Sequence, residues 1–113
     1  MNRTVRLALP NAARRSPVAG QVVLALAIAC GTGPLAGERL RRAVAGVAAE
    51  AGGALTIDAV AERGRLELTL TASPDDGWSD RALARLGQYD TARTPAGITV
   101  RVQRASLRRV PDV

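Results

Sequence analysis

The chain of 113 residues contains no histidine, no phenylalanine and no lysine, and only one cysteine, one tryptophan and one tyrosine. With no histidine and with Cys30 as the single thiol, the sequence excludes a tetrahedral Cys/His zinc site, a histidine-based triad and an internal disulfide. Aromatic residues make up 2% of the chain, which disfavours nucleic acid as a partner because single strands bind by stacking on aromatic side chains. These absences exclude a large part of the known enzyme classes. Taken together with the motifs described below, they lead us to expect no catalytic residues, no metal and no cofactor.

The positive charge of the chain comes from arginine alone. Its 16 basic residues face 10 acidic ones, for a net charge of +6, which suits an acidic partner. Richness in Arg, Ala and Gly is equally typical of a GC-rich genome, so the charge alone does not predict phosphate binding. The length allows one domain, and we expect it to span residues 1–106, followed by a flexible basic tail over residues 107–113.

Apolar periodicity predicts one strand and two helices in the first half of the chain. Residues 4–9 alternate as in a strand. Ser16 and Pro17 are typical of a helix start, and the run that follows is apolar on nearly every side, so we expect this helix to be buried on more than one side. A second helix is expected from Leu35 or Glu38 to Ala51, with one apolar and one charged side.

The second half predicts two hairpins separated by a short helix. Residues 54–61 and 65–71 alternate and are joined by a short link that ends in a glycine, which is typical of an antiparallel pair. Strands around residues 88–93 and 98–103 repeat this arrangement across a turn at residues 94–97.

A polar loop over residues 73–78 precedes the expected short helix, which Ser79 or Asp80 would cap and which ends near Gly87. Helices grouped apart from hairpin-linked strands indicate an α+β fold. The expected architecture is a two-layer sandwich, in which helices cover one face of a mixed or antiparallel sheet.

The apolar run from Val18 to Cys30 permits a second interpretation. It is shorter than the ~18 residues that a transmembrane helix needs, and we expect no membrane-spanning segment. However, arginines precede it, and Ala27-Ile28-Ala29-Cys30 resembles a lipoprotein cleavage box with Cys30 as the lipid-bearing residue. The strand-like alternation ahead of the run argues against a signal peptide, so the main expectation is a cytoplasmic protein in which Cys30 is buried and inert.

Three segments carry a resemblance to a known family. They are Arg3-Thr-Val-Arg-Leu-Ala-Leu-Pro10, Leu40-Arg-Arg-Ala-Val-Ala-Gly-Val-Ala-Ala-Glu50 and Gly97-Ile-Thr-Val-Arg-Val102. In this layout the chain resembles the small bacterial anti-sigma factor serine kinases of the histidine-kinase-like ATPase superfamily. The resemblance covers most of residues 3 to 104 and rests on pattern rather than on a signature motif.

The family's nucleotide motifs are degenerate in this chain. Where the resemblance places a Glu and a magnesium-holding Asn on the second helix, the sequence has Gly46 and Glu50. The family's Asp-x-Gly-x-Gly box would fall at residues 74–78, which lack the second glycine, and the nucleotide lid is essentially absent. The resemblance therefore implies a scaffold without catalysis, which acts by binding a sigma factor or a regulator similar to an anti-anti-sigma protein.

Five residues are the candidate partner-binding surface. Trp78 lies in the polar loop, where an exposed anchor and a plug over the sheet edge are both open interpretations. The other four are the loop carboxylates Asp75 and Asp76 and the helix arginines Arg41 and Arg42. A homodimer through the sheet or the first helix is a further possibility, because a helix this apolar exceeds what one small sheet covers.

Two alternatives assign chemistry to the acidic residues. An active kinase with divergent motifs would use Glu50 or Asp75 at the nucleotide. A magnesium site would use Asp75, Asp76 and Asp80, although a solvated turn followed by a helix cap explains the same three residues.

Overall fold

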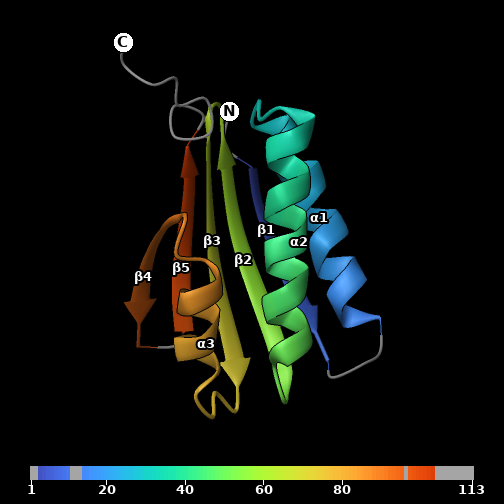
Figure 1. Cartoon of the computed structure of the whole chain (residues 1–113). Coiled ribbons are helices and arrows are strands. Elements are labelled where there is room, and N and C mark those ends of the chain that lie inside the picture. The colour runs from blue at the N-terminus through green and yellow to red at the C-terminus, as the bar shows by residue number, and fades with distance from the viewer. Residues whose placement is uncertain (1–2, 11–13, 96, 104–113) are drawn as a thin grey trace.

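The fold is an antiparallel sheet with all of its helices on one face (Figure 1). The computed structural model describes residues 3–10, 14–95 and 97–103. Within them the sheet has five strands in the order β1-β2-β3-β5-β4, and every neighbouring pair is antiparallel. The predicted α+β sandwich is confirmed, and of the mixed and antiparallel alternatives the sheet is antiparallel.

The element boundaries follow the predicted ones closely. The helices are α1 (Arg15–Ala29), α2 (Pro34–Glu50) and α3 (Trp78–Arg85). The strands are β1 (Arg3–Leu9), β2 (Ala54–Glu62), β3 (Arg65–Ser73), β4 (Asp90–Thr94) and β5 (Gly97–Gln103). The expected basic tail at residues 107–113 and Ala96 of the second hairpin turn lie outside the described residues.

Period-two alternation gives the sheet one apolar and one polar face. In the β2–β3 hairpin, Gly64 supplies the left-handed backbone of the link, with a φ of 79°. The register places Ile57 opposite Leu70 and Asp58 opposite Thr69. Leucine, isoleucine, valine and alanine therefore point toward the helices, while threonine and charged side chains line the opposite face.

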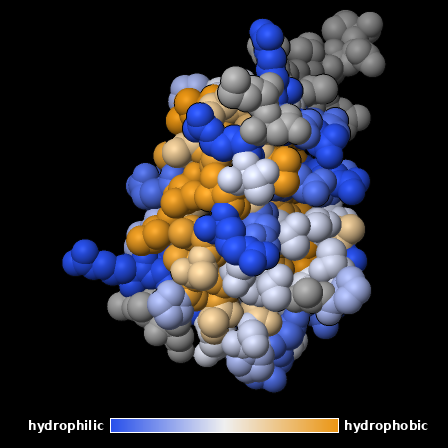
Figure 2. Space-filling model, turned by 180° about the vertical axis from the view of Figure 1, so that it is seen from behind, coloured by the Kyte–Doolittle hydropathy of each residue, from blue (hydrophilic) through white to orange (hydrophobic). Residues whose placement is uncertain are grey.

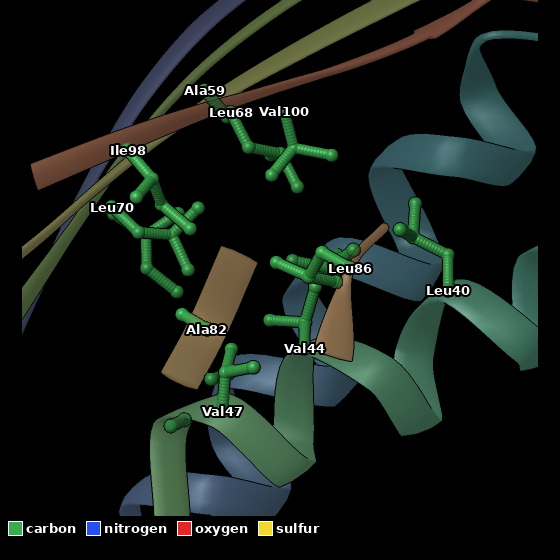
Figure 3. Close-up of a cluster of buried hydrophobic side chains, with 14 of the residues drawn as sticks. Leu40, Val44, Val47, Ala59, Leu68, Leu70, Ala82, Leu86, Ile98 and Val100 are labelled. Carbon is green, nitrogen blue, oxygen red and sulfur yellow. The ribbon is translucent and has the colours of Figure 1, made fainter. Parts of the chain in front are cut away.

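The core lies between the central strands and helices α2 and α3. Figure 3 shows side chains of α2 meeting those of β3 and β5, with α3 closing the cluster. Trp78, Leu40, Leu68 and Leu86 are among its fully buried members. This core holds α2 and α3 against each other and so fixes the geometry at their junction.

Helix α1 lies beside α2 over the β1 side of the sheet (Figure 1). Its crossing with α2 is close at Gly20, where an added Cβ would lie 3.0 Å from Cγ of Arg41. Val23 is fully buried, but Val18 and Ile28 are 42% and 53% exposed. The expectation that this helix is buried on more than one side is wrong, because α1 is the outermost helix of the layer and its outer side faces solvent in the described part of the chain.

Two helix starts differ from the predicted ones. The Ser16 hydroxyl does not cap α1 but donates to the Ala45 carbonyl of α2 at 2.7 Å, and α1 starts at Arg15. Helix α3 starts at Trp78 rather than after Ser79 or Asp80. Its first turn is capped by Asp75, which accepts the Ser79 N–H at 3.0 Å. Ser16 thus joins α1 to α2 instead of capping α1. Helix α3 is capped by a residue of the preceding loop instead of by Ser79 or Asp80.

Candidate functional site

The junction of α2 and α3 contains the positions at which the resemblance places a nucleotide. The last turns of α2 carry Gly46 and Glu50, and the loop after β3 leads directly into α3. The structure brings these two segments together, because the Trp78 indole N–H donates to the Val47 carbonyl at 2.7 Å. The junction is therefore closed by side chains of the protein itself.

Trp78 is fully buried in this junction, with 0% of its surface exposed. The expectation that it is an exposed interface anchor is wrong, and the alternative, a side chain that folds back as a plug, describes its position. The physical reason lies in α2, because carbonyls in the last turn of a helix lack the N–H donor four residues further on. One of them is the acceptor for the indole N–H, so burial of the ring also satisfies a helix end.

An arginine covers Gly46, the position at which the resemblance would place a Glu. A Cβ added at Gly46 would lie 3.5 Å from Nη1 of Arg85. The Arg85 guanidinium forms an ion pair with Glu50, and Nε of Arg81 lies 3.9 Å from Oε2 of the same carboxylate. Where the resemblance places a magnesium-holding Asn, the chain has Glu50, whose charge is balanced by Arg81 and Arg85 of α3. Gly46 has no side chain that could act as the general base of an active kinase.

The loop carboxylates Asp75 and Asp76 and the α3 carboxylate Asp80 make separate contacts. Asp75 accepts hydrogen bonds from the backbone and the hydroxyl of Ser79, and the hydroxyl bond is the main reason that the pKa of Asp75 is below its ordinary value. Asp80 forms an ion pair with Arg93. Asp76 is exposed to solvent, and its backbone has a left-handed φ of 47°. Across residues 3–10, 14–95 and 97–103, no group of three acidic or cysteine side chains is arranged to hold a metal ion.

The two predicted arginines of α2 differ in their surroundings. The Arg41 side chain is 27% exposed and lies against α1 at Gly20. Its Nε donates to Glu38 of the same helix, α2, at 2.9 Å. Arg42 is 77% exposed and lies 3.5 Å from the same Glu38 carboxylate. The hydrogen bond from Arg41 is the main reason that the pKa of Glu38 lies below its ordinary value. Arg42 is therefore the better placed of the two to meet a partner.

Arg15 makes a buried structural contact that the sequence did not predict. It is 6% exposed, and its guanidinium donates to the carbonyls of Ala51 and Gly53, directly after the end of α2. A cation at this place also complements the negative end of the helix dipole. In the sequence Arg15 is one member of an arginine pair before an apolar run, and nothing local distinguishes it from Arg14.

Cys30 is buried where α1 ends, and its Sγ donates to the Arg65 carbonyl at 3.3 Å. Burial raises the pKa of this thiol. The residues before it form β1 and α1, so the lipoprotein alternative would delete both elements on cleavage. The mass of the mature protein tests that alternative.

Because the reactive species is the thiolate, we expect Cys30 to react slowly in the folded protein. At pH 8, alkylation by iodoacetamide should be slower than in the urea-unfolded chain by a factor on the order of ten or more. Since the pKa is raised, the rate should still be increasing with pH where an ordinary thiol has levelled off. Equal rates in the folded and unfolded chains would contradict burial.

Comparison with known proteins gives no family assignment. Neither a scan against protein-family models nor a search of the curated proteins finds a match. In the part of the chain that the structure describes, no helix is long and apolar enough to cross a membrane. The α2–α3 junction and the surfaces around it are therefore the features from which a function is inferred.

Proposed function

We propose that this chain is a non-catalytic regulatory domain of the cytoplasm that binds a protein. Its scaffold is similar to that of the anti-sigma factor serine kinases, with the nucleotide site degenerate. The proposed partner is a sigma factor or a regulator similar to an anti-anti-sigma protein.

One observation carries the non-catalytic part of this proposal. The junction between α2 and α3 is filled by the Trp78 ring, and Arg85 extends across Gly46 to pair with Glu50. A nucleotide placed there would have to displace a buried indole and break the ion pairs that Glu50 forms with Arg81 and Arg85. Both costs oppose nucleotide binding.

Arginines on α2 and α3 support a protein partner. The exposed arginines of these helices are Arg39, Arg42, Arg81 and Arg85. Among the described residues, Glu38 and Glu50 balance only part of their charge, and the whole chain carries +6. Exposed arginines are frequent in protein interfaces and speed the encounter with an acidic surface.

Calorimetric titration of the full chain with ATP and Mg²⁺ tests the absence of a nucleotide site. We expect no binding heat. We also expect no rise in Tm, since only a ligand that binds the folded state stabilises it. Binding at micromolar ATP would contradict the degenerate site and favour the active-kinase alternative.

Charge reversal tests the protein-binding surface. The full chain is used to purify its partner from the source cell, and the purified complex is then measured with variants. Arg42→Glu should weaken binding by about tenfold or more, whereas Arg63→Glu, an identical change at the exposed β2–β3 link, should not. Binding that is equal for both variants, or that hardly weakens between low and high salt, would contradict this surface.

A further inference from the structure

We infer that two copies of this chain associate through β1 and the outer side of α1, and that their sheets join edge to edge. The occupant of this surface is a second copy of the same chain. The inference is independent of the proposed function, because it rests on a different side of the molecule from the α2–α3 junction.

The two edges of the sheet differ in how well they resist pairing. Strands β1 and β4 are the outermost strands in the described sheet. β4 has five residues, among them Asp90 and Arg93, and shortness and charge are usual protections of an edge. β1 also carries charge, at Arg3 and Arg6, and is followed by Pro10, so length is the feature that separates the two edges. β1 has seven residues and pairs with β2 along its full length. Its helix-facing side chains Val5 and Leu7 are only half-buried.

The outer side of α1 lies next to this edge and is apolar. The three large hydrophobic residues exposed in the described chain, Val18, Ile28 and Leu35, lie on α1 or at the start of α2. Figure 2 shows a band of hydrophobic surface over the side of the molecule where α1 and β1 lie. From Ser16 to Ala29 the helix has no charged residue, whereas the solvent-facing side of a surface helix is normally charged.

The residues of this outer side follow the spacing of a helix–helix contact. Val18, the half-buried Val22, Ala25 and Ala29 are four, three and four residues apart, so they form one stripe along the helix, with the exposed polar Gln21 beside it. The alanines of the stripe permit a close approach of a second helix. A partner for it must itself be apolar and uncharged, which the same stripe of a second copy supplies.

The sequence of β1 allows an antiparallel pairing with itself. With a two-fold axis perpendicular to the sheet, Leu7 lies opposite Leu7 of the second copy, and Val5 lies opposite Leu9. On the polar face Arg6 then lies opposite Ala8, so the two arginines are diagonal rather than directly opposite neighbours. The alternative register that centres on Arg6 would place like charges directly opposite each other, which is destabilising.

Arg6 itself does not block this pairing. Its Nε donates to Oδ1 of Asp58 on β2 at 2.7 Å, so its side chain is drawn over its own sheet and its charge is balanced there. The interface therefore joins an apolar helix stripe and an apolar strand side to identical surfaces, with no uncompensated charge at its centre.

Sedimentation equilibrium of the full chain at about 1–500 μM tests the inference. We expect a monomer–dimer equilibrium that persists or strengthens in 0.5 M NaCl, because salt screens the repulsion between two chains of charge +6. A monomer at every concentration, or a dimer that salt dissociates, would overturn the inference.

Two alanine-to-glutamate variants locate the interface. Ala25 and Ala84 are both exposed helix residues, on α1 and α3 respectively, so circular dichroism should show both variants folded. Ala25→Glu should raise the dimer dissociation constant by about tenfold or more by burying a charge, while Ala84→Glu should leave it unchanged. Equal effects would place the contact elsewhere and contradict the inference.

Hydrogen exchange separates strand pairing from a contact of the helices alone. Between dilute and concentrated protein, the amides of β1 that point away from β2 should gain protection, and those of β4 should not. This outcome supports edge-to-edge pairing. Protection that appears in α1 without β1, or in β4 instead of β1, would overturn it.

Discussion

Trp78→Ala should destabilise the fold by about 3–5 kcal/mol and lower Tm by more than about 12 °C. The substitution removes the largest fully buried side chain of the core, at the point where α3 meets α2. The cavity also leaves the Val47 carbonyl without its indole donor. Urea unfolding followed by circular dichroism measures the loss, with the slope m showing whether the unfolding remains a single transition.

Trp78→Phe separates the two contributions. Phenylalanine fills most of the space but has no N–H, so the variant chiefly loses the bond to Val47 and should cost about 1–3 kcal/mol. Trp78 fluorescence in the unaltered chain should be blue-shifted, as expected for a ring away from water. If Trp78→Ala cost less than about 1 kcal/mol, the ring would not be buried, and the exposed-anchor interpretation would regain its basis.

The strands were predictable because their signal is local. The alternation in residues 54–61 and 65–71 and the glycine of the short link determine both the hairpin and the side that faces the helices. In α2 the spacing of Leu40, Val44 and Val47 likewise identifies the buried side. In each case the period of the pattern matches the geometry of the element.

The position of Trp78 was not predictable in the same way. A single aromatic residue after a polar loop has no periodic context, and its burial depends on where α3 packs relative to the end of α2. Helix α1 presents the converse difficulty. Because Val18, Val23 and Ile28 place apolar side chains on several sides, the sequence does not reveal which side packs inward. Both positions are decided by contacts between segments far apart in the chain.

The end of α2 combines these non-local contacts, because it is satisfied from two sides. Within the last turn, the Ala51 N–H bonds to Ala48, and the Val47 carbonyl accepts the indole N–H of Trp78. Just after the helix, the carbonyls of Ala51 and Gly53 accept hydrogen bonds from the Arg15 guanidinium of α1. Gly53 permits this geometry, since a Cβ there would lie 2.2 Å from the Ser73 carbonyl oxygen.

Arg15→Met should therefore destabilise the fold by about 3 kcal/mol or more, since hydrogen bonds to a charged group contribute about 1.5–3 kcal/mol each. Methionine retains much of the length of the side chain but leaves the buried Ala51 carbonyl and the part-buried Gly53 carbonyl without this donor, and the change is measured by urea unfolding. Arg15→Lys should recover only part of the loss, because one ammonium group lacks the fork that reaches two acceptors.

Arg14→Met is the matched control for this prediction, since Arg14 is the exposed neighbour of Arg15 and the variant removes the same charge. It should change the free energy of unfolding by less than about 0.5 kcal/mol. If both variants were equally unstable, the loss would come from net charge or from the start of α1, and the bridge from Arg15 to the end of α2 would carry no weight. A large difference between the two neighbours would show that α1 holds the end of α2 in place, and with it the Trp78 contact that closes the α2–α3 junction.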